Sequence, residues 1–316
     1  MTRLYLIVGC TASGKGRLAL ELARRMSGQI VSVDSMKVYR RMDIGTAKPS
    51  PEARAEVPHH LIDVVEPSEY FSAARYVSLA DEAVAAIAAA GDPVIAAGGT
   101  ALYARALVEG LFEGPGADPD LRGRLTERIE REGSGALHEE LRRIDPDAAE
   151  RIHPNDARRI VRALEVHELT GRPISNMQRQ WDAGRPRYDA VTVGIRRRRE
   201  DQSRRINARV KRMMERGLRE EVESLLAEPA GIGAQAGRAL GYAEIIDHLR
   251  GGCSLEEAVE RIKINTRRLA KGQRTWWRRF PGIRWVDVAA DEPVEPVADR
   301  AMEIVAAAEP GRRSRA

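Results

Sequence analysis

The chain has little of what would mark a secreted or membrane-embedded protein. Cysteine occurs only twice, at Cys10 and Cys253, which excludes a disulfide framework and a four-cysteine zinc site. No apolar run approaches the roughly 20 residues that a membrane-spanning helix needs. These shortages favour a cytoplasmic protein that does not contact the membrane.

The composition is that of a folded chain. Hydrophobic residues make up 43% of the sequence and charged residues 31%, a balance that argues against disorder. The 316 residues are enough for two domains, or for one domain with a large insertion.

Strand-like and helix-like segments alternate along the first half of the chain. Leu4 to Val8 is a short apolar run, and Leu18, Leu22 and Met26 then recur at helical spacing. Further strands are expected at 30–33, 94–97 and 191–195, with a helix at 73–90. This alternation predicts a parallel sheet with helices on both faces.

A segment rich in glycine and proline, 110–119, interrupts this order. From Leu121 to about Thr170 the sequence is charged and helical in character, and strand character returns at Val191. We therefore predict an α/β core from 1–112 and 188–316, and an all-helical inserted subdomain from 113–187. Long basic helices are expected within the core at about 201–227 and 254–280.

A phosphate-binding loop is predicted at the first strand-to-helix turn. The segment from Gly9 to Gly16 fits the pattern G-x-x-x-x-G-K, with Lys15 as its lysine. In such a loop successive backbone N–H groups point at phosphate oxygens, and the helix N-terminus adds positive potential. The alternative is an ordinary glycine-rich turn with an exposed lysine. With this loop, the fold class is an α/β fold like that of the P-loop NTPases.

The last position of the loop departs from the pattern. Gly16 stands where a serine or threonine hydroxyl normally binds Mg²⁺. We expect Mg²⁺ as the cofactor, held by diphosphate oxygens and water, with Asp34 or Thr11 as further ligands that the sequence leaves open. An ordinary ATPase is less favoured than an enzyme that binds a diphosphate leaving group.

Positive charge is concentrated in two stretches. Residues 196–220 hold 11 lysines and arginines against 4 acidic residues, a net charge of +7. Residues 261–284 hold 9 and none, a net charge of +9, whereas the whole chain carries only +5. The remainder is therefore net acidic at −11, and such segregation is typical of a surface that faces a polyanion.

Several ordered sequence blocks resemble the tRNA dimethylallyltransferases, also called tRNA isopentenyltransferases, from about Leu4 to about Trp285. Beyond the loop, the matching blocks are 33–39 (VDSMKVY), 42–49 (MDIGTAKP), 58–63 (PHHLID), 98–103 (GGTALY), 156–165 (DARRIVRALE), 205–209 (RINAR), 217–222 (GLREEV), 239–242 (ALGY) and 266–271 (TRRLAK). Any one block is weak, but their order along the chain is specific.

The resemblance implies a reaction and a set of site residues. The family transfers a dimethylallyl group from dimethylallyl diphosphate to the exocyclic amine of the adenosine just 3′ of the tRNA anticodon. It implies Asp34 as the base, Arg209 as a diphosphate clamp and Thr100 as a further catalytic contact. The residues implied to bind the donor are Gly9, Cys10, Thr11, Ala12, Ser13, Gly14, Lys15 and Gly16. Those implied to bind the anticodon stem-loop are Asp34, Ser35, Met36, Lys37, Thr100, Arg122, Arg158, Arg159, Ile160, Val161, Arg162 and Ala163.

Structural interpretations compete with several of these assignments. Asp34 can cap the turn after its strand, and Thr100 can cap the helix that begins at Ala101. His59 and His60 lack the further ligands that a metal site needs, so we expect them to have a local structural role. Trp276 and Trp277 are favoured as core rather than as a base-stacking surface.

Other functions also remain open. A P-loop kinase of a small molecule or nucleotide would transfer phosphate from ATP. An isopentenyltransferase of the cytokinin type would act on free adenine nucleotides and would need neither the insertion nor the basic stretches. An RNA-binding protein whose catalysis has decayed is favoured only by Gly16 and Gly272, the latter standing where relatives usually carry arginine. The favoured hypothesis is a monomeric, Mg²⁺-assisted enzyme that acts on tRNA.

Overall fold

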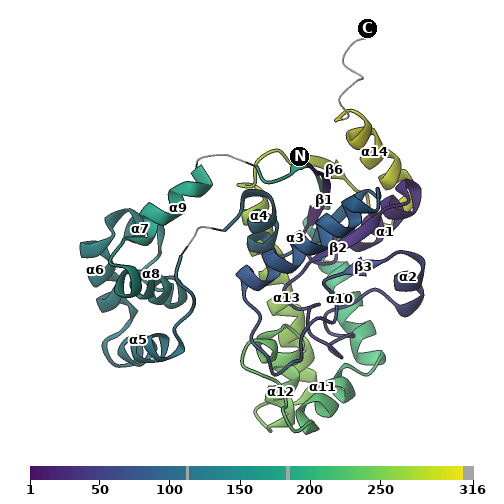
Figure 1. Cartoon of the computed structure of the whole chain (residues 1–316). Coiled ribbons are helices and arrows are strands. Elements are labelled where there is room, and N and C mark those ends of the chain that lie inside the picture. Colours follow the sequence, from purple (N-terminus) through teal and green to yellow (C-terminus); the bar gives the residue numbers. More distant parts are fainter. Residues whose placement is uncertain (112–113, 183–185, 309–316) are drawn as a thin grey trace. The chain divides into compact units, whose positions relative to one another are not determined.

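A computed structural model describes residues 1–111, 114–182 and 186–308. The chain divides into two compact units, one formed by residues 1–108 and 186–316 and the other by residues 109–185 (Figure 1). The sequence placed the division at 112/113, which lies outside the described residues, and at 187/188. We call the first the sheet unit and the second the helical unit.

The sheet unit is built on one parallel sheet of six strands. Their order across the sheet is β3-β2-β4-β1-β5-β6, and every neighbouring pair runs parallel. The strands are β1 (Arg3–Gly9), β2 (Gln29–Val33), β3 (His59–His60), β4 (Val94–Gly98), β5 (Asp189–Arg196) and β6 (Arg284–Asp287). This confirms the predicted fold class, an α/β fold with a parallel sheet.

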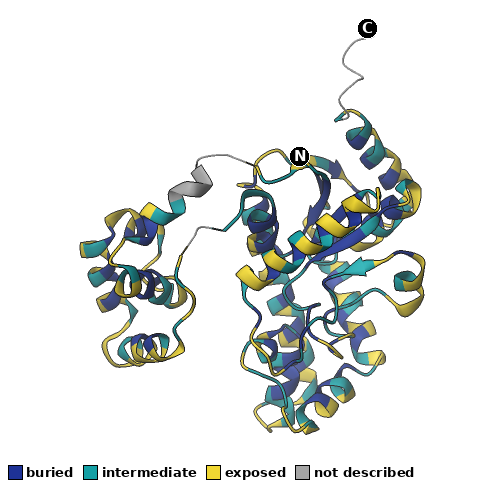
Figure 2. Cartoon of the chain, viewed as in Figure 1, coloured by how far each residue is buried: buried dark blue, intermediate teal, exposed yellow. Residues whose placement is uncertain are grey.

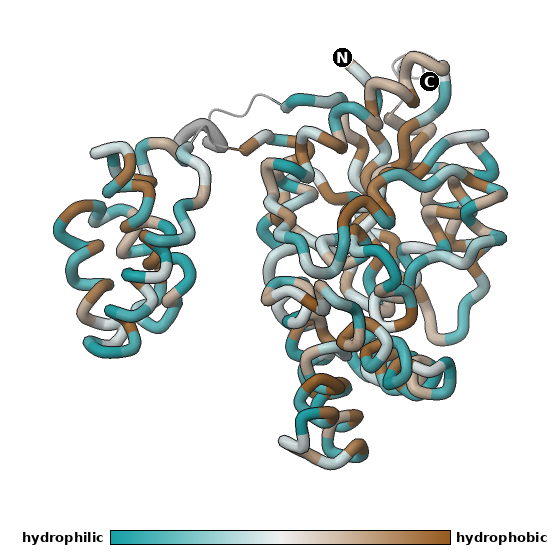
Figure 3. Tube along the Cα trace, turned by 60° about the horizontal axis from the view of Figure 1, so that its bottom comes forward, coloured by the Kyte–Doolittle hydropathy of each residue, from teal (hydrophilic) through white to brown (hydrophobic). Residues whose placement is uncertain are grey.

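Both faces of this sheet are covered by helices. The helices of the sheet unit are α1 (Lys15–Met26), α2 (Pro51–Glu56), α3 (Ala73–Ala89), α4 (Ala101–Glu109), α10 (Arg199–Glu215), α11 (Leu218–Ala227), α12 (Tyr242–Leu249), α13 (Leu255–Trp277) and α14 (Val294–Ala306), with a short 3₁₀ turn η1 (Ala236–Arg238). Because side chains alternate along a strand, Leu4 and Leu6 of β1 face one core and Tyr5 and Ile7 face the other. Strands buried on both faces read as continuous apolar runs, as β1 does (Figures 2 and 3).

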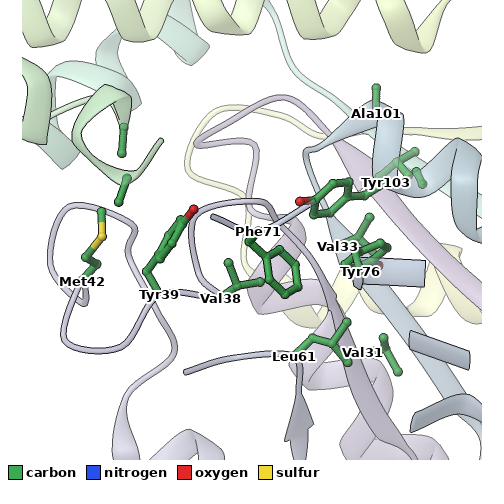
Figure 4. Packing of buried hydrophobic residues seen from close by; sticks show 14 of the residues in the cluster. Val31, Val33, Val38, Tyr39, Met42, Leu61, Phe71, Tyr76, Ala101 and Tyr103 are labelled. Carbon is green, nitrogen blue, oxygen red and sulfur yellow. The ribbon is translucent and has the colours of Figure 1, made fainter. Parts of the chain in front are cut away.

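The larger core lies between the sheet and the helices α3, α10 and α13. In Figure 4 the β2 side chains Val31 and Val33 lie beside Tyr76 of α3, and Tyr39 and Met42 extend the same cluster. The rings of Tyr76 and Tyr103 stack with their centroids 4.0 Å apart. This packing fixes the chain just after β2, where the predicted base Asp34 stands.

Two predicted helices differ from those observed. The helix expected at 201–227 is two helices, α10 and α11, because Gly217 between them has a φ of 90°. The helix expected at 254–280 ends at Trp277. The strand β6 and the helix α14 were not predicted, although Val297, Ala301 and Val305 of α14 recur at helical spacing and are buried.

The helical unit confirms the predicted helical stretch. Its helices are α5 (Pro119–Glu132), α6 (Ser134–Ile144), α7 (Pro146–Arg151), α8 (Ala157–Thr170) and α9 (Ile174–Asp182). Asp118, Asp145 and Asp156 cap the N-termini of α5, α7 and α8 by accepting backbone N–H groups. Among the described residues, none of the helices combines the length and the apolar character of a membrane span.

Candidate active site

The predicted phosphate loop joins β1 to α1. Gly9 ends the strand, Lys15 begins the helix, and Gly14 between them has a φ of 104°. No side chain caps the N-terminus of α1, so the N–H groups of its first turn are open to an anion. A β-carbon on Gly16 would meet nothing within 4 Å, so space for a ligand remains beside the loop.

Side chains from α10 and from Arg197, just before this helix, hold the loop. Arg197 Nε donates to the Ser13 carbonyl at 2.7 Å, and Arg205 Nε to the Ala12 carbonyl at 2.9 Å. Gln202 Nε2 donates to the Thr11 carbonyl. Because C=O and N–H point in opposite directions across a planar trans peptide, the N–H groups that follow these carbonyls point away from α10. None of these three side chains was among the predicted site residues, although Arg205 begins the block 205–209 and all three lie in the basic 196–220 stretch.

A second helix, α13, reaches the loop from another direction. The Thr11 N–H donates to Gln273 Oε1 at 2.7 Å, and Gln273 Nε2 donates to the Gly99 carbonyl at 2.9 Å. The Cys10 thiol lies 3.4 Å from the Ala270 carbonyl, and burial raises its pKa. Cys10 is therefore a structural residue of the loop rather than a thiolate nucleophile.

Three cations gather around one carboxylate where β2 ends. Burial lowers the pKa of Lys15 to about 8, the Asp34 carboxylate opposes this shift, and the charges of Lys37 and Arg209 add to it. Burial likewise lowers the pKa values of Lys37 and Arg209, again against the charge of Asp34. The cluster thus carries an excess of two positive charges, which a bound anion would balance.

Arg209 lies beside the loop as the resemblance implied. Its Nη1 lies 3.5 Å from the Thr11 hydroxyl, and its Nη2 lies 3.5 Å from the Thr46 carbonyl. The structure thereby brings Arg209, Lys15 and the open amides of α1 to the same edge of the sheet. Open α/β sheets bind ligands at this edge, outside the carboxyl ends of the strands.

Asp34 caps a turn with one of its two carboxylate oxygens. Its Oδ1 accepts the Met36 N–H at 3.0 Å and the Lys37 N–H at 3.4 Å. In the described part of the chain Oδ2 has no hydrogen-bond partner. The two interpretations of Asp34 are therefore compatible, one for each oxygen.

Thr100 joins the ends of two strands. Its hydroxyl accepts the Ser35 N–H at 3.0 Å and lies 3.4 Å from the Ser35 hydroxyl, and so faces this turn rather than the first turn of α4. Gly98 allows the approach, because a β-carbon there would lie 1.8 Å from the Val33 carbonyl oxygen. Thr100 thus supports the turn that contains Asp34.

The block 42–49 is held by residues from two other blocks. Glu221 of α11 accepts the N–H groups of Asp43, Ile44 and Gly45 at 3.0, 2.8 and 3.3 Å. The Tyr242 hydroxyl donates to the same carboxylate at 2.5 Å. A carboxylate and a tyrosine thereby fix the loop whose Thr46 carbonyl meets Arg209.

Two of the predicted RNA-contacting residues of the helical unit, Arg122 and Arg162, pair with a buried carboxylate. Glu165 is 0% exposed, and it accepts Arg122 Nε at 2.8 Å, Arg162 Nη1 at 2.6 Å and the Asp118 N–H at 2.8 Å. Burial would raise the Glu165 pKa, but hydrogen bonds from Arg122, Arg162 and the Asp118 N–H outweigh it and hold the pKa below its usual value.

The remaining predicted contacts lie on α8. Arg158 and Arg159 are exposed, and Arg159 pairs with Asp156 at 3.3 Å. Ile160 and Ala163 are buried in the core of the helical unit, so their side chains cannot reach RNA as predicted, whereas Val161 is half-buried. The 3.6-residue period of the helix explains this, since every third or fourth residue turns inward.

The histidine pair has the expected local role. His59 Nδ1 lies 2.6 Å from the Val57 carbonyl, and His60 Nε2 lies 2.7 Å from Gln29 Oε1. No cluster of three or more metal-ligating His, Cys, Asp or Glu side chains occurs among the residues described. Trp277 is buried, as expected of a core residue, and Trp276 is half-buried.

The chain is similar to known proteins over most of its length. The family model "IPP transferase" matches residues 37–280. The chain is 48% identical over 290 residues to the tRNA dimethylallyltransferase of Geobacter sulfurreducens, covering 92% of this chain and 93% of that one. It is 50% identical over 286 residues to that of Geobacter metallireducens, covering 90% and 93%.

Solved structures show the same likeness. The full-length tRNA isopentenylpyrophosphate transferase of Bacillus halodurans superposes with a TM-score of 0.73 at 39% identity, over 98% of this chain and 97% of that one. A eukaryotic dimethylallyltransferase acting on tRNA superposes with a TM-score of 0.79 at 25% identity. The match covers 100% of this chain and 82% of that one.

Proposed function

The chain belongs to the IPP transferase family, and we propose that it transfers a dimethylallyl group from dimethylallyl diphosphate to tRNA. The acceptor in this proposal is the exocyclic N6 amine of the adenosine 3′-adjacent to the anticodon. The observation that carries it is the uncapped N-terminus of α1 beside Lys15, Arg209 and Asp34.

The donor side of the reaction requires stabilisation of a leaving diphosphate. As the bond between the dimethylallyl carbon and the phosphate oxygen breaks, negative charge grows on the diphosphate. The open N–H groups of α1 and the charges of Lys15 and Arg209 lie where that charge would develop. The dimethylallyl carbon then bonds to N6 as the diphosphate leaves.

The acceptor side requires removal of one proton. An adenine N6 amine is a weak acid until it is alkylated, and a nearby carboxylate can then accept its proton. Oδ2 of Asp34 has no partner in the residues described, and the turn from Ser35 to Lys37 is fixed by Thr100. A base stacked in the anticodon loop must be flipped out to reach this position.

Magnesium fits this site as an ion held mainly by the diphosphate. Gly16 offers no hydroxyl, so we propose the Thr11 hydroxyl or Asp34 Oδ2 as the protein ligand. When bound, Mg²⁺ would offset charge on the leaving diphosphate.

The tRNA partner is supported by the distribution of charge. The two stretches of +7 and +9 overlap α10 and α13, which also supply side chains that hold the phosphate loop. We propose that these helices and the exposed arginines of α8 bind the anticodon stem-loop, and that the protein acts as a monomer in the cytoplasm.

A labelling experiment tests the proposed function. Labelled dimethylallyl diphosphate is incubated with unmodified tRNA, with AMP or with ADP, and labelled ATP is tested separately. Label in the tRNA alone is the expected result. Label in AMP or ADP would indicate the cytokinin-type reaction, and phosphate transfer from ATP would indicate a kinase.

A further inference from the structure

Two N–H groups of the phosphate loop already have acceptors within the protein, and that of Ser13 donates to the Cys10 carbonyl at 3.2 Å. The Thr11 N–H, on the strand side of the loop, donates to Gln273 Oε1 at 2.7 Å. The other end of the same carboxamide donates to the Gly99 carbonyl at 2.9 Å. Gln273 therefore spans the gap between the ends of β1 and β4, which are neighbours in the sheet.

The carboxamide of Gln273 lies next to the loop lysine. A β-carbon placed on Gly99 would lie 2.7 Å from Gln273 Nε2 and 3.2 Å from Lys15 Nζ. Both side chains thus end at the same backbone position. In P-loop proteins the amides cradle the inner phosphates and the lysine reaches toward the outermost one. Gln273 therefore lies beside Lys15, the side chain that reaches toward the outermost phosphate in such proteins.

The N–H groups on the helix side of the loop differ from the Thr11 N–H in whether they have an acceptor within the protein. The N–H groups of the first turn of α1 carry no side-chain cap, so they remain available to phosphate oxygens. The Thr11 N–H is satisfied within the protein and is not available. Fewer backbone N–H groups are therefore available to phosphate oxygens than the length of the loop suggests.

We propose that Gln273 is a positioning residue that limits the phosphate chain at this site to two phosphates. This inference rests on the proposed function, because the donor proposed there carries a diphosphate. It explains how a loop of the P-loop type can select a diphosphate donor over a nucleoside triphosphate. The selection comes from one carboxamide that both satisfies the Thr11 N–H and fills the adjoining space.

The test compares the binding of inorganic diphosphate and of tripolyphosphate by calorimetry at fixed Mg²⁺, using the full chain. Gln273→Ala and Gln273→Asn both free the Thr11 N–H and open the space beside Lys15. We expect each to shift the ratio of the two affinities toward tripolyphosphate by about tenfold, the effect of one hydrogen bond to a charged group. Gln273→Asn shortens the side chain but keeps its carboxamide, so it separates the loss of reach from the loss of polarity on α13.

Gln202→Ala is the matched control, because Gln202 donates to the carbonyl of the same residue, Thr11, without blocking an N–H group. It should weaken both ligands together and leave the ratio unchanged. An unchanged ratio in both Gln273 variants, or an equal shift in Gln202→Ala, would overturn the role of Gln273. If the wild-type chain binds neither polyphosphate, the proposed donor site itself is wrong.

Discussion

At the scale of single residues, the proposed base Asp34 uses one of its two carboxylate oxygens for structure. Oδ1 closes the turn by accepting the N–H groups of Met36 and Lys37. The same carboxylate faces Lys15 and Arg209, whose pKa values it raises against the effect of burial. A substitution that keeps the turn but removes the base separates these two roles.

Asp34→Asn makes that separation, because its amide oxygen can still accept the two N–H groups. We expect turnover to fall by about 10²-fold or more, the usual contribution of a general base. Donor affinity should hold or rise, since one negative charge leaves the cationic cluster. Steady-state kinetics with tRNA measures both quantities, and near-normal turnover would exclude Asp34 as the base.

Lys15 makes donor binding sensitive to pH. Burial lowers its pKa to about 8 in the free protein, so the side chain is charged at pH 7 and neutral at pH 9. Because only the charged form attracts diphosphate, the affinity for inorganic diphosphate should fall as the pH rises through 8. Lys15→Arg removes the titration of this residue, so the affinity of the variant should fall less than that of the wild type between pH 7 and pH 9. Equal falls in the two proteins would contradict the prediction.

At the scale of helices and strands, the sequence pattern predicted the elements that are built by neighbouring residues. The loop from Gly9 to Lys15 lies between a strand and a helix as the sequence indicated, because adjacent residues build it. Gln273 and Gln202 meet Thr11 across 262 and 191 positions of sequence. Such contacts depend on how helices pack on the sheet, and no periodicity or spacing encodes them.

Two glycines in basic helical segments are predicted to behave oppositely. Gly217 has a φ of 90° between α10 and α11, so Gly217→Ala should lower the free energy of unfolding by about 1–2 kcal/mol. Gly272 lies inside α13 with nothing within 4 Å of a β-carbon, so Gly272→Ala should raise it by about 1 kcal/mol. Urea denaturation measures both changes, and shifts of the same sign would refute this distinction.

The helix α8 contributes Glu165, a carboxylate that organises its own unit. Glu165→Gln removes the buried charge that Arg122 and Arg162 share. Because the two arginines lose their buried partner charge, the free energy of unfolding should fall by about 3 kcal/mol. Amide hydrogen exchange should rise first in residues 119–170. Glu168→Gln, an exposed change on the same helix, is the control and should alter stability by less than about 0.5 kcal/mol. Equal exchange in the two variants would contradict this role.

At the scale of the whole molecule, the net charge of +5 conceals a division between basic and acidic regions. The basic helices α10 and α13 pack against one another and both reach the phosphate loop. The cations that would bind RNA phosphates therefore share their helices with the side chains that order the donor loop. This arrangement links the two substrates of the proposed reaction through the same elements.

The binding of tRNA should therefore depend steeply on salt, because each phosphate contact releases counterions. Gly272 is exposed on α13 within the stretch of +9, next to the exposed Lys271. Gly272→Arg adds a cation there and should steepen the plot of log affinity against log salt by about one unit. Gly272→Ala controls for helix propensity, since it improves the helix without adding charge. If the two variants give the same slope, α13 does not contact the tRNA backbone at this position.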